Sequence, residues 1–374
     1  MKKLQKEVLG EDHKPVFFRL NLESDRQKYD ELLNSGLSIT VFDQIDGQLN
    51  ELIKCLNPSK QILPEQYRDL IEAHLNGQSL KEYGVWVYYS WNRNLIHILD
   101  EAEFIEVRTN RNRNKITRQE QETLKTKKIG IVGLSVGQSI ALTIAMERTC
   151  GEIRLADFDV AELSNLNRLR AGLHNLGLKK TIIAAREIAE IDPFIKIRIY
   201  DEGLHTGNMD DFFLDCGKLD LLIEVCDGLE TKIRSRIEAR KLKIPVIMDT
   251  NDRGMLDIER FDLEPERPVL HGLTDGVDPD RIGGLSNPEK MALIMKIVGA
   301  ETISDRLRAS MAELGKTLNN LPQLASSVVL GGAISTDAAR RILLDQYHQS
   351  GRYYIDTEEL ISNKFNTQSI VLAE

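Results

Sequence analysis

The middle of the chain alternates short apolar runs with longer segments whose apolar residues recur at helical spacing. This alternation predicts strands at 127–132, 152–159, 195–200, 219–225 and 244–248, and helices at 138–149, 179–191 and 230–241. Strands that alternate with helices in this way indicate a mostly parallel sheet covered by helices on both faces. We therefore expect an α/β, Rossmann-like fold whose ligands bind at the carboxyl ends of the strands.

The flanking sequence suggests three parts. Residues 1–105 read as a small α/β module, with a helix leading into a strand over 28–43 and two strands on either side of residues 92–94. Residues 106–350 read as the main domain, in which 254–287 is rich in Pro, Gly and Asp and is expected to be an irregular loop. Further helices are expected over 287–298 and 325–344, and residues 351–374 as a polar C-terminal tail.

Composition narrows the class of partner. The 374 residues are 41% apolar and 29% charged, which is ordinary for a globular protein. The net charge of −9 argues against nucleic acid or a membrane surface as a primary partner, because both require a basic footprint. No apolar run approaches the length of a membrane span, and the four cysteines form no C-x-x-C pair. We expect a cytoplasmic protein without a structural zinc site.

The turn G-L-S-V-G at 133–137 lies between a predicted strand and a predicted helix and has two interpretations. As a nucleophile elbow it would make Ser135 the nucleophile of a hydrolase, with Asp249 and either His271 or His348 as partners. As a dinucleotide-binding turn it would place a phosphate at the helix N-terminus, with Asp157 at the position of a ribose-binding carboxylate. The turn and the acid alone leave NAD and ATP undecided.

The motifs downstream of the turn are more specific. D-F-D at 157–159, S-N-L-N-R at 164–168 and two lysines at 179–180 occur in order, and here the sequence resembles the ThiF/MoeB/E1-like superfamily. The resemblance extends through C-D-G-L-E-T-K-I-R at 226–234 to a Gly/Ala-rich helix near 331–344, and covers about residues 108–347. Members of this superfamily use ATP to adenylate a carboxyl group, often the C-terminus of a ubiquitin-like protein.

The resemblance implies roles for individual residues. Asp157 would hold the ribose hydroxyls of ATP, and Asp227 would coordinate Mg²⁺, with Asp159 assisting the metal or shaping its loop. Arg168 and Lys180 match the phosphate-binding pair of the family, with Lys179 as the rival of Lys180. The remaining nucleotide-binding positions implied are Gly133, Ser135, Ser164 and Asn165. Separate interpretations stay open for Asp157 as a strand-end acid, for Asp227 as a helix cap and for Ser164 as a turn or cap residue.

A basic stretch precedes the first strand of the main domain. Family members carry R-x-x-R there, and the second arginine reaches the ATP site of the neighbouring subunit. Arg108-Thr109-Asn110-Arg111 has this spacing, so the resemblance implies that Arg111, with Arg113 as the alternative, acts in trans within a homodimer.

The sequence departs from the family pattern at two places. Ser135 and Val136 replace two glycines of the phosphate-binding turn, and no cysteine follows Cys226, where thioester-forming members carry one. We therefore expect adenylation of a small-protein or peptide carboxylate with ATP and Mg²⁺, without an enzyme thioester in the usual loop. An NAD(P)-binding oxidoreductase and a non-catalytic nucleotide-binding scaffold are the alternatives. Substrate specificity is expected in the loop from about Gly254 to Asn287.

Overall fold

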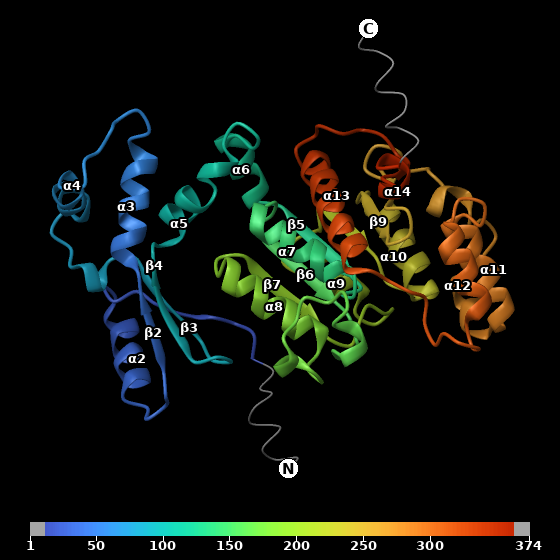
Figure 1. Cartoon of the computed structure of the whole chain (residues 1–374), viewed down its shortest axis with the longest axis horizontal. Coiled ribbons are helices and arrows are strands. Elements are labelled where there is room, and N and C mark those ends of the chain that lie inside the picture. The colour runs from blue at the N-terminus through green and yellow to red at the C-terminus, as the bar shows by residue number, and fades with distance from the viewer. Residues whose placement is uncertain (1–11, 363–374) are drawn as a thin grey trace, which may run out of the picture. The chain divides into compact units, whose positions relative to one another are not determined.

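The computed structural model describes residues 12–362, which divide into two compact units (Figure 1). The first contains the described residues up to 121 together with 189–194, and the second contains 122–188 and the rest from 195 onward. Within the described range, no helix has both the length and the apolar character needed to cross a bilayer.

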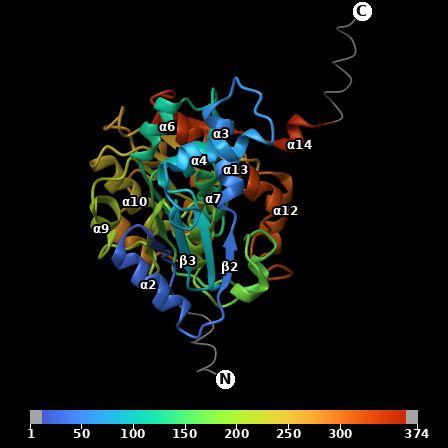
Figure 2. The same cartoon turned by 90° about the vertical axis from the view of Figure 1, so that its left-hand side faces the viewer.

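The first unit is built on a four-stranded sheet with the order β1-β3-β4-β2. β3 (Val85–Tyr89) and β4 (Asn94–Ile98) form the predicted antiparallel pair, β1 (Val16–Phe18) pairs with β3, and β2 (Thr40–Asp43) runs parallel to β4 at the other edge. Figure 2 faces this unit, with β2, β3 and three of its helices labelled. Its helices are α2 (Glu23–Leu33), α3 (Ile45–Leu56), α4 (Gln66–Leu75) and α5 (Glu101–Arg108), and α6 (Arg118–Lys125) spans the boundary between the units.

The second unit contains a seven-stranded sheet with the order β11-β10-β9-β8-β5-β6-β7. The five strands from β9 to β7 are parallel, which confirms the predicted Rossmann-like α/β class. Their bounds are β5 (Lys128–Val132), β6 (Glu152–Ala156), β7 (Lys196–Tyr200), β8 (Leu221–Glu224) and β9 (Val246–Thr250). β5, the first strand of this unit, lies in the middle of the sheet, with β6 on one side and β8 on the other. The strand order therefore reverses at β5, and the carboxyl ends of β5, β6 and β8 lie side by side there. Such a position favours ligand binding.

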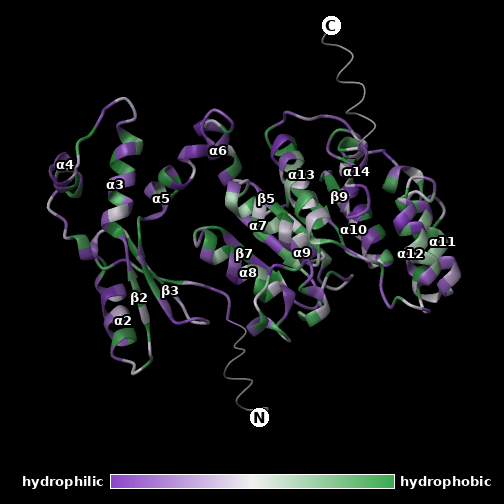
Figure 3. Ribbon diagram, in the orientation of Figure 1, coloured by the Kyte–Doolittle hydropathy of each residue, from purple (hydrophilic) through white to green (hydrophobic). Residues whose placement is uncertain are grey.

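Helices cover both faces of this sheet. They are α7 (Gly137–Glu147), α8 (Lys180–Ile191), α9 (Met209–Leu214), α10 (Leu229–Lys241) and α13 (Ala325–Leu343). Figure 3 contrasts the mostly hydrophobic α7 with the hydrophilic α6. α13 packs closely on α7, because Gly332 presents no side chain: a Cβ there would lie 2.5 Å from the Ser139 Oγ.

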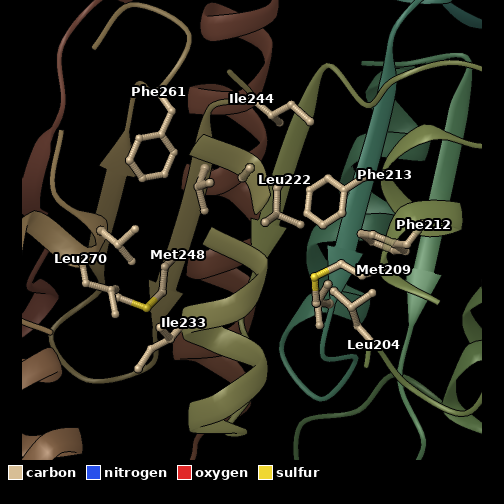
Figure 4. Close-up of a cluster of buried hydrophobic side chains, with 14 of the residues drawn as sticks. Leu204, Met209, Phe212, Phe213, Leu222, Ile233, Ile244, Met248, Phe261 and Leu270 are labelled. Carbon is tan, nitrogen blue, oxygen red and sulfur yellow. The ribbon is translucent and has the colours of Figure 1, made fainter. Parts of the chain in front are cut away.

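One core lies between the sheet and α10. Figure 4 shows Met248 of β9 beside Ile233 of α10 and Leu270, while Leu222 of β8 lies toward Phe213 of α9. All of these side chains are at least nine-tenths buried. Strands buried on both faces read as continuous apolar runs, which is why β5 and β8 could be recognised from the sequence.

The segments expected to be irregular contain more structure than predicted. Residues 255–259, placed in the loop 254–287, form β10 (Met255–Glu259), and residues 351–354, placed in the tail, form β11 (Gly351–Tyr354). Both pair antiparallel at the edge of the main sheet. β10 is fully buried although it carries Asp257 and Glu259, because Arg352 donates to Asp257 and Arg236 donates to Glu259 at 2.7 Å. Because two of its five buried residues are charged, the strand lacks the apolar pattern by which a buried strand is predicted from the sequence.

The rest of the chain is mostly helical. The 3-10 helices η5 (Val269–Gly272) and η6 (Pro279–Gly284) follow β10, and α11 (Asn287–Val298) and α12 (Asp305–Glu313) precede α13. α11 has the predicted bounds, and a capping box between Ser286 and Glu289 fixes its start. The final helix described is α14 (Thr357–Leu360).

Candidate functional site

A cavity of about 650 Å³ opens at the carboxyl ends of β5, β6 and β8 in the second unit. The residues expected to bind nucleotide from the sequence gather around it, together with Asp227. They are Gly133, Ser135, Asp157, Asp159, Ser164, Asn165, Arg168 and Lys180. The structure thus brings together side chains that are up to 94 positions apart in the sequence (133 to 227).

The turn after β5 requires glycine at its first position. Gly133 has a φ of +90°, and a Cβ there would lie 2.8 Å from both the N and the Cα of Cys226, beyond the end of β8. Any side chain would therefore push apart the turns that follow two neighbouring strands. The turn leads directly into α7 at Gly137, so an anionic group at this end of the cavity would face the positive end of a helix.

Asp157 directly follows β6 and faces this turn. Its Oδ2 accepts a hydrogen bond from the Leu134 N–H at 2.6 Å, and its Oδ1 accepts one from the Asp159 N–H at 2.8 Å. Burial raises the pKa of the carboxyl, while the two backbone donors oppose the rise. Each oxygen keeps a lone pair for a further donor, which is the arrangement that two ribose hydroxyls need.

Arg168 crosses the cavity mouth toward the turn. Its Nε donates to the Ser135 Oγ at 3.1 Å, and its Nη1 donates to the Asn167 Oδ1 at 2.9 Å. Burial lowers the pKa of the guanidinium and Asp227 raises it in part, so the two side chains interact electrostatically. Ser135 occupies a family glycine position and here supplies an acceptor that orients the arginine.

Lys180, at the first position of α8, is the lysine that lines the cavity. Its side chain is 6% exposed, and its Nζ donates to the Asp159 Oδ2 at 2.8 Å. The neighbouring Lys179 instead donates to the backbone oxygens of Phe158 at 2.6 Å and Asp201 at 3.0 Å. The structure therefore separates the two rivals: Lys180 lines the cavity, and Lys179 is not among the residues that line it.

Asp227 follows β8 and is exposed to the cavity. The N-cap of α10 is Gly228, which makes no side-chain cap, and the Asp227 carboxylate accepts no hydrogen bond from another residue within 12–362. The helix-cap interpretation is therefore wrong. A solvent-facing carboxylate beside a cavity suits Mg²⁺, which typically takes one or two protein carboxylates and completes its shell with water and phosphate oxygens.

Ser164 and Asn165 lie on the 3-10 helix η3 (Leu163–Asn165). The Asn165 Oδ1 accepts from the Glu162 N–H at 3.1 Å, as half of a reciprocal cap, and the Ser164 backbone oxygen accepts from Arg168 at 3.5 Å. Both residues line the cavity while shaping the loop that carries Arg168.

Arg111 and Arg113 belong to the first unit, whereas every residue that lines the cavity belongs to the second. Arg111 lies on the 3-10 helix η2 (Asn110–Asn112), and Arg113 forms an ion pair with Glu106.

The hydrolase interpretation fails on geometry. Ser135 accepts from Arg168, while the His271 Nε2 lies 2.9 Å from the Asp257 Oδ1 and the His348 Nε2 lies 2.9 Å from the Asp345 Oδ1. Neither histidine hydrogen-bonds to Ser135, so neither of the predicted bases is in place to activate its hydroxyl.

One part of the cavity wall carries no signal in the sequence. Residues 320–323, just before α13, line the cavity, and the Gln323 backbone oxygen accepts from the Asn167 Nδ2 at 2.8 Å. This loop has neither a glycine turn nor a charged motif, so only the folded chain reveals its place.

Comparison with known proteins identifies relatives of several kinds. Residues 109–272 match the ThiF family. The chain is 42% identical over 324 residues to an uncharacterized protein of Mycobacterium tuberculosis (strain CDC 1551 / Oshkosh), a match that covers 87% of this chain and 43% of that protein. It is 25% identical over 247 residues to the tRNA threonylcarbamoyladenosine dehydratase of Bacillus subtilis (strain 168), covering 62% of this chain and 94% of the relative.

The solved structures add a likeness in fold. The E. coli tRNA N6-threonylcarbamoyladenosine dehydratase TcdA in complex with ATP matches with a TM-score of 0.48 at 16% identity, covering 67% of this chain and 98% of that one. The chain spans less than half the length of the mycobacterial relative, and nearly the whole length of the Bacillus one.

Proposed function

We propose, taking residues 109–272 as a ThiF family domain, that this protein uses ATP to adenylate a carboxylate and releases pyrophosphate. The family is one of ATP-dependent adenylating enzymes. The observation that carries the proposal is the convergence of two cations, Arg168 and Lys180, with two carboxylates, Asp157 and Asp227, around one cavity. A cavity that bound only a nucleoside would have little use for the cations.

In this proposal each of these groups binds one part of ATP. The Asp157 carboxylate would accept hydrogen bonds from the ribose hydroxyls at the end of β6. The phosphates would lie along the turn at Gly133 and the start of α7, within reach of Arg168 and Lys180. Asp159 holds the Lys180 ammonium at 2.8 Å and so keeps it ordered before the phosphate binds.

The reaction then needs position and charge rather than a protein nucleophile. An oxygen of the substrate carboxylate forms a bond to the α-phosphorus, the bond from that phosphorus to the bridging oxygen breaks, and pyrophosphate leaves with the electron pair. No proton moves in this step. Arg168 and Lys180 would stabilise the charge that builds on the departing phosphates.

Asp227 would hold the metal ion. Its carboxylate, which faces the cavity, would supply a hard oxygen ligand, and Mg²⁺ bound there would neutralise phosphate charge. Among residues 12–362, no group of three or more His, Cys, Asp or Glu side chains could hold a metal alone. A site of this kind therefore depends on ATP for its remaining ligands.

Cys226 is poorly suited to carry a thioester. Burial and the nearby Glu224 raise the pKa of its thiol, and its Sγ lies 3.7 Å from the Gly228 backbone oxygen. A thiol that stays protonated is a weak nucleophile. This supports our proposal that the acyl-adenylate passes to its acceptor without an intermediate on this cysteine.

The wider proposal concerns partners. The substrate would be the C-terminal carboxylate of a small ubiquitin-like protein or peptide, and the protein would act in the cytoplasm as a homodimer in which Arg111 completes the site of its partner. The observation that supports the dimer is the R-x-x-R spacing at residues 108–111.

Calorimetric titration with ATP plus Mg²⁺, NAD⁺ and NADP⁺ tests the nucleotide. We expect binding of ATP alone, weakened by Arg168→Ala, with Lys179→Ala as the matched control. Binding of NAD⁺ would support the oxidoreductase instead. Carboxylate-dependent exchange of labelled pyrophosphate into ATP then tests the reaction, and ATP binding without exchange for any carboxylate would favour the scaffold.

A further inference from the structure

A second cavity, of about 320 Å³, adjoins the one described above. Val225, Cys226 and Asp227 border both cavities from one side, and Leu321, Pro322 and Gln323 border both from the other. The two cavities therefore share two stretches of wall, one of which carries Asp227. Its volume lies at the lower end of the range for small-ligand pockets, so it has room for a short acyl chain.

A third of its 21 lining residues are apolar side chains on two helices outside the family match. α11 contributes Met291, Ile294, Met295, Ile297 and Val298, and α12 contributes Leu307 and Met311. Methionines adapt their shape to the chain they contact, which suits a wall that encloses a flexible ligand. None of the described residues that line either cavity comes from 254–287, the segment in which the sequence predicts specificity.

The part of the cavity wall that follows β9 is polar. Asp249, near the end of β9, lines it and is 5% exposed, yet both carboxylate oxygens are buried without a hydrogen-bond partner among the described residues. The Asn251 Oδ1 lines the same cavity and is also buried without a partner there. The nearest cation in this wall, Lys232, donates instead to Glu224 at 2.8 Å. An unpaired buried acceptor lowers the stability of the fold, so a ligand that donates hydrogen bonds to these oxygens would be stabilising.

The fold makes room for the Asp249 carboxylate. α13 crosses β9 at Gly331, where a Cβ would fall 2.2 Å from the Asp249 Oδ2. A residue larger than glycine at this position would displace the acid. Three acceptor oxygens without a donor of their own match a primary ammonium group, which offers three N–H donors and no acceptor.

We infer that the second cavity binds the acyl chain of the substrate and selects an apolar chain that ends in a primary amine, as in a peptide with a C-terminal lysine; this inference rests on the proposed adenylation. The substrate carboxylate would lie beside Asp227, the apolar part of the chain against α11 and α12, and the ammonium between Asp249 and Asn251. Burial raises the pKa of the Asp249 carboxyl to about 7, so pairing with an ammonium also relieves an unfavourable buried charge.

Two probes that differ only in the amine test this inference. Nα-acetyl-lysine carries the carboxylate and the terminal amine, and Nα-acetyl-norleucine has a chain of nearly the same length without the amine. At pH 8, calorimetry should show the lysine probe binding at least about tenfold more tightly, because a charge-assisted hydrogen bond is worth more than about 1.4 kcal/mol. Asp249→Asn should remove this preference, and Asp305→Asn, which takes one charge from the exposed start of α12, should keep it.

A second variant keeps the test independent of Asp249. Met295→Trp fills the apolar wall from α11, so it should abolish binding of both probes while ATP affinity changes by less than about twofold. Thermal unfolding and ATP titration of each variant show that it is folded. Equal affinity for the two probes, no binding of either, or a preference unchanged in Asp249→Asn would each overturn the inference.

Pyrophosphate exchange in the same samples separates the two proposals. Asp249-dependent binding of the lysine probe without exchange would leave the pocket in place and overturn adenylation. Equal exchange with both probes would support adenylation and overturn the selectivity of the second cavity.

Discussion

The Asp157 carboxylate accepts a hydrogen bond from the Leu134 N–H at 2.6 Å, so the acid that follows β6 also holds the turn that follows β5. The same carboxylate accepts from the Asp159 N–H at 2.8 Å. A residue assigned to the ribose thus has a second task, which is to fix the two loops that must approach the nucleotide. Its substitution should change stability and ligand binding together.

Asp157→Ala and Asp157→Asn should separate these tasks. The alanine variant leaves two backbone donors without their acceptor and should lower the free energy of unfolding by about 1–3 kcal/mol. The asparagine variant keeps one acceptor and should lose less stability, yet both should weaken ATP binding at least about tenfold, because a neutral group replaces the carboxylate. Urea unfolding and ATP titration measure the two effects. Unchanged ATP affinity in both variants would show that Asp157 stabilises the turn but does not bind ATP.

Asp227→Asn should retain its fold and lose magnesium-dependent turnover. The side chain is exposed and caps no helix, so the melting temperature should shift by no more than about 1 °C. Loss of the metal ligand should lower the pyrophosphate-exchange rate by about 100-fold or more. Exchange measured against Mg²⁺ concentration checks this, with Glu230→Gln on α10 as the control. Full activity in Asp227→Asn would show that Asp227 is not the metal ligand.

Ser135→Ala should be a mild change. Its hydroxyl accepts from the Arg168 Nε at 3.1 Å, so the loss of one orienting contact should weaken ATP binding by about threefold to tenfold. A nucleophilic serine would behave differently, since its removal typically abolishes turnover. ATP affinity and exchange rate distinguish the two, and a loss of activity beyond about 1000-fold with intact ATP binding would revive the hydrolase.

Asp249 should make the stability of the protein depend on pH. Burial raises its folded-state pKa to about 7 from an ordinary value of 3.8, so the folded state holds this proton more tightly than the unfolded chain does. Between pH 4 and pH 7 the Asp249 carboxyl is largely ionised in the unfolded chain and largely protonated in the folded protein. The contribution of this group to the free energy of unfolding therefore falls as the pH rises through this range. Asp249→Asn should gain on the order of 2–4 kcal/mol relative to the wild type over that range.

Urea unfolding of the wild type and Asp249→Asn at several pH values checks this, with Asp305→Asn as the control. Parallel curves for all three proteins would show that Asp249 titrates normally. The nearby Lys232 ammonium is bonded to Glu224, so it does not neutralise Asp249 in the free protein.

Arg111 should act on the neighbouring subunit. Arg111→Ala and Lys180→Ala should each be inactive, because each removes a cation from every site. In verified mixed dimers one site regains both cations, so mixing should restore up to about one active site per dimer. Pyrophosphate exchange after mixing measures the recovery, and Arg113→Ala serves as the comparison. Absence of recovery in mixed dimers would place Arg111 outside the site.

The parallel strands and the cavity around Asp157 and Arg168 could be predicted because short apolar strands and closely spaced motifs are local properties of the sequence. The sequence favours Lys180 over Lys179 only by resemblance, since their separation depends on where α8 begins and on the backbone oxygens that Lys179 meets. β10 was hidden by Asp257 and Glu259, whose partners lie far along the chain. The loop at 320–323 carries no local pattern, and only tertiary packing brings it to the wall.

The loop at 320–323 could couple the binding of two ligands. Because Leu321, Pro322 and Gln323 border both cavities, a ligand that repositions them in one cavity changes the fit of a ligand in the other. Such an effect is reciprocal: if ATP strengthens the binding of the acyl substrate by some factor, the acyl substrate strengthens the binding of ATP by the same factor. If each ligand repositions this shared wall, the two proposed sites would therefore be coupled, and measuring the affinity for each ligand with and without the other would show it.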